Sequence, residues 1–102
     1  MIELDPRFSK YVLSHCKVAL REYDFILKNV PDEPWILRIK AVKENGDKRY
    51  KGICNLMVRR EKEEKFFHPS MKSETPDQAI YLTLTMFLLG EIKELAKDKA
   101  FK

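Results

Sequence analysis

The pair Asn45-Gly46, set between two runs of alternating apolar and polar residues, constrains the fold of this chain more than any other feature. Both central positions of a type I′ turn need positive φ, which asparagine and glycine tolerate best, and such a turn joins adjacent antiparallel strands. With this pair as the loop, the sequence predicts a hairpin with strands over residues 34–43 and 48–59. The predicted cross-strand pairs include Trp35 with Leu56, Leu37 with Cys54, Ile39 with Gly52, Ala41 with Tyr50, and Lys40 with Lys51.

Alternation divides this hairpin into two unlike faces. One face carries only uncharged side chains and is expected to be buried, with Gly52 making room for a helix or marking a bulge. The other face places two lysines opposite each other, which is unfavourable without an anionic partner, and it also carries four apolar residues. Its basic residues are the candidate nucleic-acid contacts: Arg38, Lys40, Arg49 and Lys51.

A helix is expected before the hairpin. Asp5 can accept hydrogen bonds at the helix start, and Pro6 suits the first helical position because it has no N–H to leave unpaired. Apolar residues then recur at helical spacing as far as Leu27, with polar residues on the predicted solvent face. Two prolines end this segment before the hairpin: Pro31 and Pro34.

A second helix is expected after the hairpin. Thr75 and Pro76 repeat the start of the first, Gln78 completes a capping box, and the helix is expected to end near Lys97. A short third strand is expected at residues 66–68. The predicted fold is therefore α+β in the order α-β-β-β-α, with two helices on one face of a three-stranded antiparallel sheet.

The expected second helix is more apolar than a helix on one sheet needs to be. Its apolar residues cover an arc of about 260° at 100° per residue, whereas a surface helix needs a stripe of about 100°. Either the rest of the chain buries the excess, or part of it meets a second copy in a homodimer. The residues expected at the dimer interface are Tyr81 and Leu88, with Ala79, Thr83 and Gly90 in a notch of small side chains.

Length and composition restrict the class of protein. One domain is expected to span residues 1–102. The longest apolar run, 79–89, is about half of the ~20 residues that cross a bilayer, and the N-terminus lacks a signal-peptide pattern, so we expect a cytoplasmic protein without a membrane span. Cys16 and Cys54 are expected as free thiols, with a bridge between them as the alternative. Scarce glutamine and asparagine leave a thermophilic source and an ordinary one both open.

The sequence offers no set of residues for catalysis. His15 adjoins Cys16, and neighbouring helical residues point 100° apart, so the two cannot comfortably share a metal. Three glycines are too few for a phosphate-binding loop, and no pair of carboxylates lies in an apolar setting that would separate an acid from a base. No enzymatic activity, metal or cofactor is therefore expected.

Positive charge is concentrated in the hairpin. Residues 38–65 contain ten basic residues against five acidic ones, in a chain whose net charge is +4. This favours a non-enzymatic binding or accessory protein that presents the basic sheet face to nucleic acid. Two alternatives stay open: a solvated face without a partner, and a protein- or peptide-binding adaptor that uses the sheet face, a free sheet edge or the apolar second helix.

Overall fold

Most of the regular secondary structure is sheet. The computed structural model describes residues 3–32 and 35–101; Pro34, where the hairpin is expected to begin, lies outside them. A five-stranded antiparallel sheet has the order β1-β2-β3-β4-β6, and β5 and β7 form a second, two-stranded sheet. The elements are the 3-10 helix η1 (Pro6–Lys10), β1 (Val12–Ala19), β2 (Glu22–Leu27), β3 (Trp35–Val42), β4 (Tyr50–Cys54), β5 (Leu56–Arg60), β6 (Lys72–Ser73), α1 (Pro76–Leu88) and β7 (Ile92–Lys97).

The two strands β1 and β2 form a hairpin where the sequence predicts a helix, so the predicted fold with two helices and three strands is wrong. Only the start of that helix exists, as η1, where the Asp5 carboxylate accepts the N–H of Arg7 at 2.9 Å. In β2 the buried Tyr23, Phe25 and Leu27 alternate with more exposed residues. The same apolar residues also fit a helical spacing, but aromatic and β-branched side chains favour the strand.

The turn at Asn45-Gly46 exists, but it is not of type I′. The N–H of Asp47 donates to the carbonyl of Glu44 at 3.0 Å and closes a four-residue turn, yet only Gly46 of the central pair has a positive φ, of 82°. The two turns whose twist matches that of adjoining strands, I′ and II′, both need a positive φ at the first central position, which Asn45 does not have. The strands therefore stop short of the turn on both sides, and residues 43–49 form a longer loop.

This longer loop shifts the pairing of β3 with β4 by two residues, so the predicted register is wrong. Ile39, not Leu37, faces Cys54, and Lys40 faces Ile53. The two lysines predicted to oppose each other are therefore not cross-strand partners. A shift of two residues leaves every side chain on its original face, so the uncharged face is the buried one, as expected.

The helix α1 begins as the sequence predicts and ends much earlier. The Thr75 hydroxyl accepts the N–H of Gln78 at 3.2 Å, and Pro76 takes the first helical position. Beyond Leu88, Gly90 adopts a φ of 79°, and residues 92–97 form β7 instead of continuing the helix. Three residues of the predicted apolar arc, Ile92, Leu95 and Ala96, therefore belong to this strand and not to the helix. No helix of the described residues is long and apolar enough to cross a membrane.

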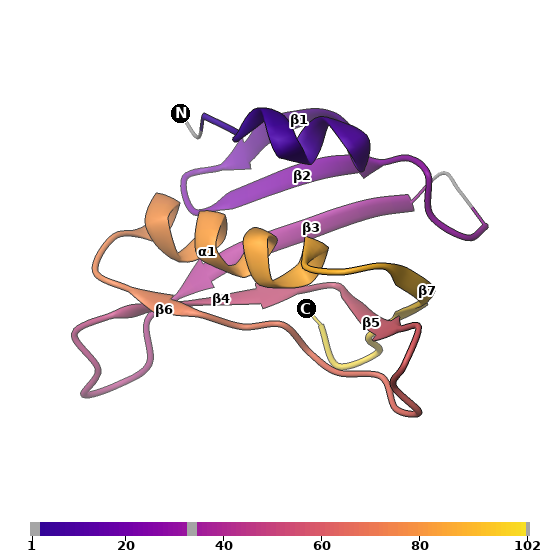
Figure 1. Cartoon of the computed structure of the whole chain (residues 1–102). Coiled ribbons are helices and arrows are strands. Elements are labelled where there is room, and N and C mark those ends of the chain that lie inside the picture. The colour runs from indigo at the N-terminus through magenta and orange to yellow at the C-terminus, as the bar shows by residue number, and fades with distance from the viewer. Residues whose placement is uncertain (1–2, 33–34, 102) are drawn as a thin grey trace.

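The helix covers one face of the five-stranded sheet, with η1 beside it (Figure 1). The Phe8 ring of η1 lies 5.9 Å from the Tyr81 ring of α1. The helix α1 lies close to the sheet at Gly52, where an added Cβ would lie 2.0 Å from the Thr83 hydroxyl oxygen and 3.0 Å from the Ala79 carbonyl oxygen. Gly52 therefore makes room for a helix, which is one of its two predicted roles.

One long strand serves both sheets. Residues 50–60 run through β4 and β5 with a break at Asn55, where the strand leaves β3 and begins to pair with β7. The expected third strand at residues 66–68 is reduced to one bridge, between Phe67 and Val58. The strand that pairs with the far side of β4 is instead the two-residue β6.

Candidate functional site

The face of the five-stranded sheet opposite α1, here called the open face, carries the predicted basic residues. Alternation along β3 and β4 places Arg38, Lys40 and Lys51 on this face, because their neighbours in the strands are buried under α1. Arg49 is not in a strand; it is exposed in the loop before β4, where its N–H donates to the Asp47 carboxylate at 2.9 Å. The structure thus brings three of the four predicted contacts to one face.

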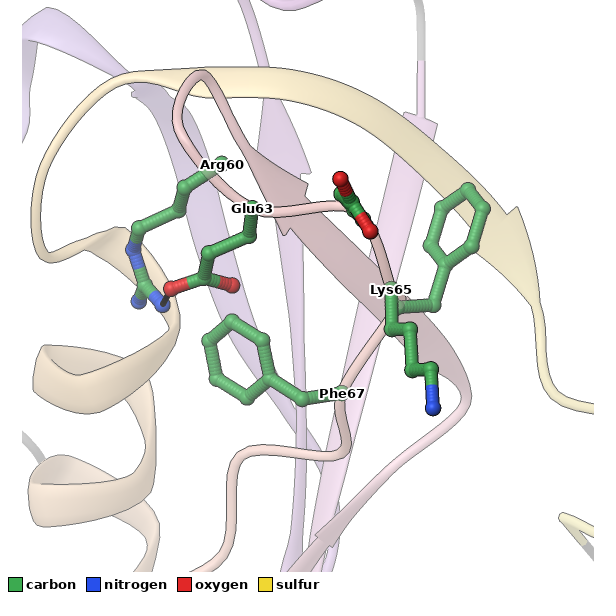
Figure 2. Close-up of a pocket in the computed structure, with 6 residues that line it drawn as sticks. Arg60, Glu63, Lys65 and Phe67 are labelled. Carbon is green, nitrogen blue, oxygen red and sulfur yellow. Dashed lines mark ion pairs between the residues drawn. The ribbon is translucent and has the colours of Figure 1, made fainter.

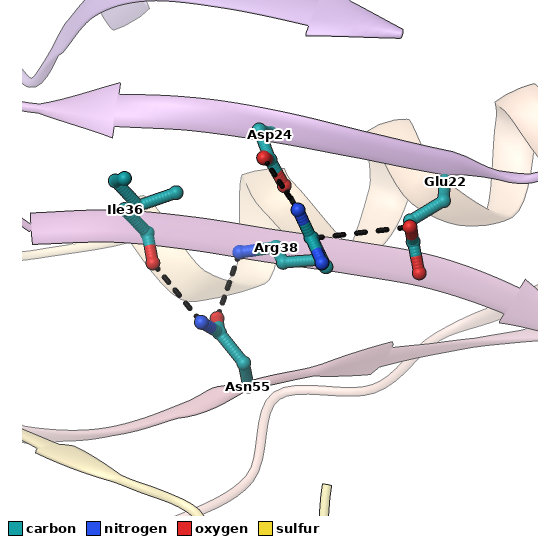
Figure 3. A network of polar contacts seen from close by, with 5 residues as sticks. All are labelled: Glu22, Asp24, Ile36, Arg38 and Asn55. Atoms are coloured by element: carbon teal, nitrogen blue, oxygen red, sulfur yellow. Dashed lines mark hydrogen bonds and ion pairs between the residues drawn. The ribbon is translucent and has the colours of Figure 1, made fainter. Parts of the chain in front are cut away.

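Two acidic residues share the open face, and sequence analysis misses both. Arg38 forms a two-pronged ion pair with Asp24, at 2.7 and 2.9 Å, and lies 3.8 Å from Glu22 (Figure 3). Hydrogen bonding to Asp24 raises the pKa of Arg38. Both acids belong to β2, a segment that the sequence analysis predicts to be helical. The alternation of charged and aromatic residues at the start of β2 was the signal that could have placed both acids on one sheet face. The charge of Arg38 is therefore matched within the sheet.

The remaining lysines of the face are less strongly paired. Lys51 lies 3.7 Å from Glu44, an exposed pair that contributes little. The ammonium group of Lys40 lies 4.7 Å from the centroid of the Phe101 ring, in the C-terminal segment. A cation over an aromatic face at this distance is attracted by the ring and still has room for a further anionic contact.

A groove of about 500 Å³ lies next to Lys40, where β3, the break in the long strand and the C-terminal segment meet. It is partly apolar and partly charged, and it combines two aromatic side chains with one lysine of β7. The residues that line it are Trp35, Ile36, Asn55, Leu56, Lys97, Asp98 and Phe101. Ile36, a large apolar side chain near the start of β3, is 54% exposed.

The walls of the groove are held in place by hydrogen bonds. The Trp35 indole N–H donates to the Pro31 carbonyl at 2.7 Å. The Asn55 side chain accepts the N–H of Arg38 at 2.7 Å and donates to the Ile36 carbonyl at 3.0 Å (Figure 3). These bonds add to the main-chain bond from the Asn55 N–H to the Arg38 carbonyl, at 3.0 Å, where β4 leaves β3. The Asn55 carbonyl accepts the N–H of Asp98 at 2.9 Å, which fixes the C-terminal segment.

The five residues predicted to form a dimer interface do not share one surface. Ala79 and Thr83 are fully buried between α1 and the sheet, and Leu88 is 6% exposed. Tyr81 is partly exposed, and Gly90 lies at the surface just beyond the end of the helix. A second copy that binds this helix would reach only the last two of these residues.

A second hollow, of about 570 Å³, surrounds Arg60 and the loop after β5 (Figure 2). The Arg60 guanidinium lies 4.3 Å from the Phe67 ring centroid and donates to the carbonyls of Met86 and Leu89. It therefore caps the C-terminal end of α1, where main-chain carbonyls lack helical partners. Burial lowers the pKa of Arg60. Because these donors stabilise the helix end, the hollow is not the leading candidate for a binding site.

Metal and thiol chemistry find little support among the described residues. No group of three or more His, Cys, Asp and Glu side chains in residues 3–32 and 35–101 could hold a metal ion. Cys16 is exposed and Cys54 is buried, and both are free thiols, as expected. Burial raises the pKa of the Cys54 thiol to about 12, so it is a poor nucleophile near neutral pH.

No protein-family model, no curated protein and no solved structure matches this chain. The function is therefore inferred from the open face and the groove beside it.

Proposed function

We propose that this chain is a non-enzymatic binding protein that holds single-stranded nucleic acid in the groove at the edge of the open face. The observation that carries the proposal is a groove lined by two aromatic residues, Trp35 and Phe101, and by Lys97, with Lys40 next to it over the Phe101 ring. Proteins that bind single strands combine aromatic surfaces for the bases with cations for the phosphates.

The charges restrict which basic residues serve as phosphate contacts. Arg38 is matched by Asp24, so it contributes less than the sequence predicts. Lys40 and Lys97 have no carboxylate within ion-pair distance among the described residues. Two phosphate contacts on a single strand predict a slope of about −1.4 for log K against log salt concentration. The rings provide stacking, which contributes about 1–3 kcal/mol per base.

Trp35 is the only tryptophan of the chain, so its fluorescence reports directly on the groove. We expect single-stranded DNA and RNA oligonucleotides to quench this fluorescence, and the affinity to fall about seven-fold as salt rises from about 50 to about 200 mM. Phe101→Ala should weaken binding about ten-fold or more, because one stacked base is lost. Lys40→Glu with Lys97→Glu should abolish binding at physiological salt.

The matched control is Lys10→Glu, because Lys10 lies on η1, which packs beside α1 on the other face of the sheet. This variant changes the net charge by the same amount per site and should bind as the native protein does. Equal losses of affinity in the Lys10→Glu and Lys40→Glu variants would mean that only the net charge matters, and would refute binding in the groove. A peptide ligand would instead bind with little dependence on salt.

A further inference from the structure

The strand β1 is an exposed edge that carries much apolar surface. It spans eight residues at the edge of the five-stranded sheet, and no described strand pairs with its outer side. Leu13, Val18 and Leu20, in β1 and the turn after it, are 63%, 45% and 76% exposed. They are three of the five large apolar side chains that are exposed in the described residues. An edge strand of this kind is a template for pairing with another chain.

The opposite edge of the sheet does not share this property. It is formed by β6, which has only two residues, and Lys72 of β6 forms an ion pair with Asp47 at 2.8 Å. Short, charged edges of this kind resist further pairing. The sheet therefore has one edge that can be extended, the outer side of β1. The strand β2 separates this edge from β3, which contributes to the groove.

We infer that β1 pairs with β1 of a second copy of this chain, antiparallel and about a two-fold axis perpendicular to the sheet. Such pairing joins the two five-stranded sheets into one and keeps both α1 helices on the same side. The two irregularities of β1, at Leu13 and Val18, leave residues 14–17 as the regular part for main-chain pairing. The exposed apolar side chains then meet on either side of this central part.

Charge and apolar pattern select one register. Pairing centred on Lys17 would place two lysines directly opposite each other, which is unfavourable. Pairing centred on His15 would place Leu13 against Lys17. Pairing centred on Cys16 avoids both, because it sets Lys17 against His15. Its other pairs are Val12 with Leu20, Leu13 with Ala19, Ser14 with Val18, and Cys16 with its own copy.

The mass of the protein in solution tests whether β1 pairs with a second copy. The native protein should give twice the chain mass of 12.1 kDa in light scattering at micromolar concentration. Leu13→Lys with Leu20→Lys should give a folded monomer, because both side chains are exposed and the core is untouched. The control is Leu89→Lys, which removes an equally exposed side chain, at 62%, from the end of α1 and should stay dimeric. Far-UV circular dichroism verifies that each variant is folded.

The thiol of Cys16 tests the register. Directly opposed residues of an antiparallel pair have Cα atoms about 4.5–5.5 Å apart, which a disulfide can bridge. Diamide, which accepts the two electrons and two protons of a thiol pair, should therefore convert the native protein to a covalent dimer. Cys16→Ser should abolish this product and leave the mass in light scattering unchanged, whereas Cys54→Ser should leave both the covalent product and the mass unchanged.

Two results would overturn the inference, and a third would overturn the register. A native mass of 12.1 kDa across the concentration range would show that the edge has no second copy on it. A dimer that survives Leu13→Lys with Leu20→Lys but dissociates with Leu89→Lys would place the interface at α1. A dimer that resists diamide in the native form would exclude the register centred on Cys16.

Discussion

Replacing Gly52 by alanine tests a close contact between the helix and the sheet. The new Cβ would lie 2.0 Å from the hydroxyl oxygen and 2.8 Å from the Cβ of Thr83, far inside van der Waals contact. Thr83 is fully buried and its hydroxyl accepts the N–H of Met71 at 3.1 Å, so it cannot rotate away without leaving that donor unpaired. The Ala79 carbonyl, at 3.0 Å, is backbone and cannot yield either.

The expected loss of stability in Gly52→Ala is the sum of two costs. Forcing an extra carbon into a packed core costs about 1–3 kcal/mol, and a buried donor left without its partner costs about 1–3 kcal/mol. We therefore expect Gly52→Ala to lower the free energy of unfolding by about 3–4 kcal/mol, a large part of the ~5–15 kcal/mol available to a domain of this size. Urea denaturation followed by circular dichroism measures the change.

A double-mutant cycle separates the clash from other effects. Thr83→Ala alone should cost about 1–3 kcal/mol, because Met71 loses its acceptor. In the double variant the new methyl group of residue 52 occupies space that Thr83 has vacated, so the sum of the two single costs should exceed the double cost by at least about 1 kcal/mol. The control is Gly46→Ala, which meets no atom within 4 Å and should cost only about 1–2 kcal/mol through its positive φ. Additive effects, or a Gly52→Ala cost no larger than that of the control, would refute the reasoning.

Three further predictions concern single residues. Thr75→Ala should lower the free energy of unfolding by about 1 kcal/mol, since it removes the cap of α1, and Thr75→Ser should retain most of it in the same urea assay. Asn55→Ala should cost about 2 kcal/mol, because it leaves two main-chain groups of β3 without partners, and hydrogen exchange should speed up at the Arg38 amide, which loses its acceptor. In Cys16→Ser protein, Cys54 should not react with a thiol reagent at mildly alkaline pH until urea unfolds the chain, because its pKa is about 12; prompt reaction would contradict its burial.

Local signals in this sequence are reliable where the chemistry is local. The caps at Asp5 and Thr75 start helical turns as predicted, because each depends on a side chain and an N–H two or three residues away. The end of α1 depends instead on Gly90 and on donors from Arg60, which lies 26 residues from Met86 in the chain. Neither the length of that helix nor the strand after it follows from spacing alone.

The apolar residues before the predicted hairpin fit both the helical period and the strand period, and tertiary contacts decide between the two structures. Tyr23, Phe25 and Leu27 fit a strand as well as a helix, and in the structure they lie beside β3. The same decision determines the charge of the candidate site, because it places Asp24 next to Arg38. Sequence analysis finds Lys40 as a candidate contact but misses Phe101, since the C-terminal segment is predicted to be a helix end.

The double role of Asn55 gives the groove a thermodynamic connection to the C-terminal segment. Its side chain holds β3, and its main-chain carbonyl holds Asp98, so the residue that forms part of the groove also joins the two sheets. A ligand that binds the groove only while these hydrogen bonds are formed stabilises the hydrogen-bonded state by RT ln(1 + [L]/Kd). Local opening of β7 would then become rarer as ligand is added. The exchange rates of the amides of residues 92–96, which do not line the groove, would then report its occupancy.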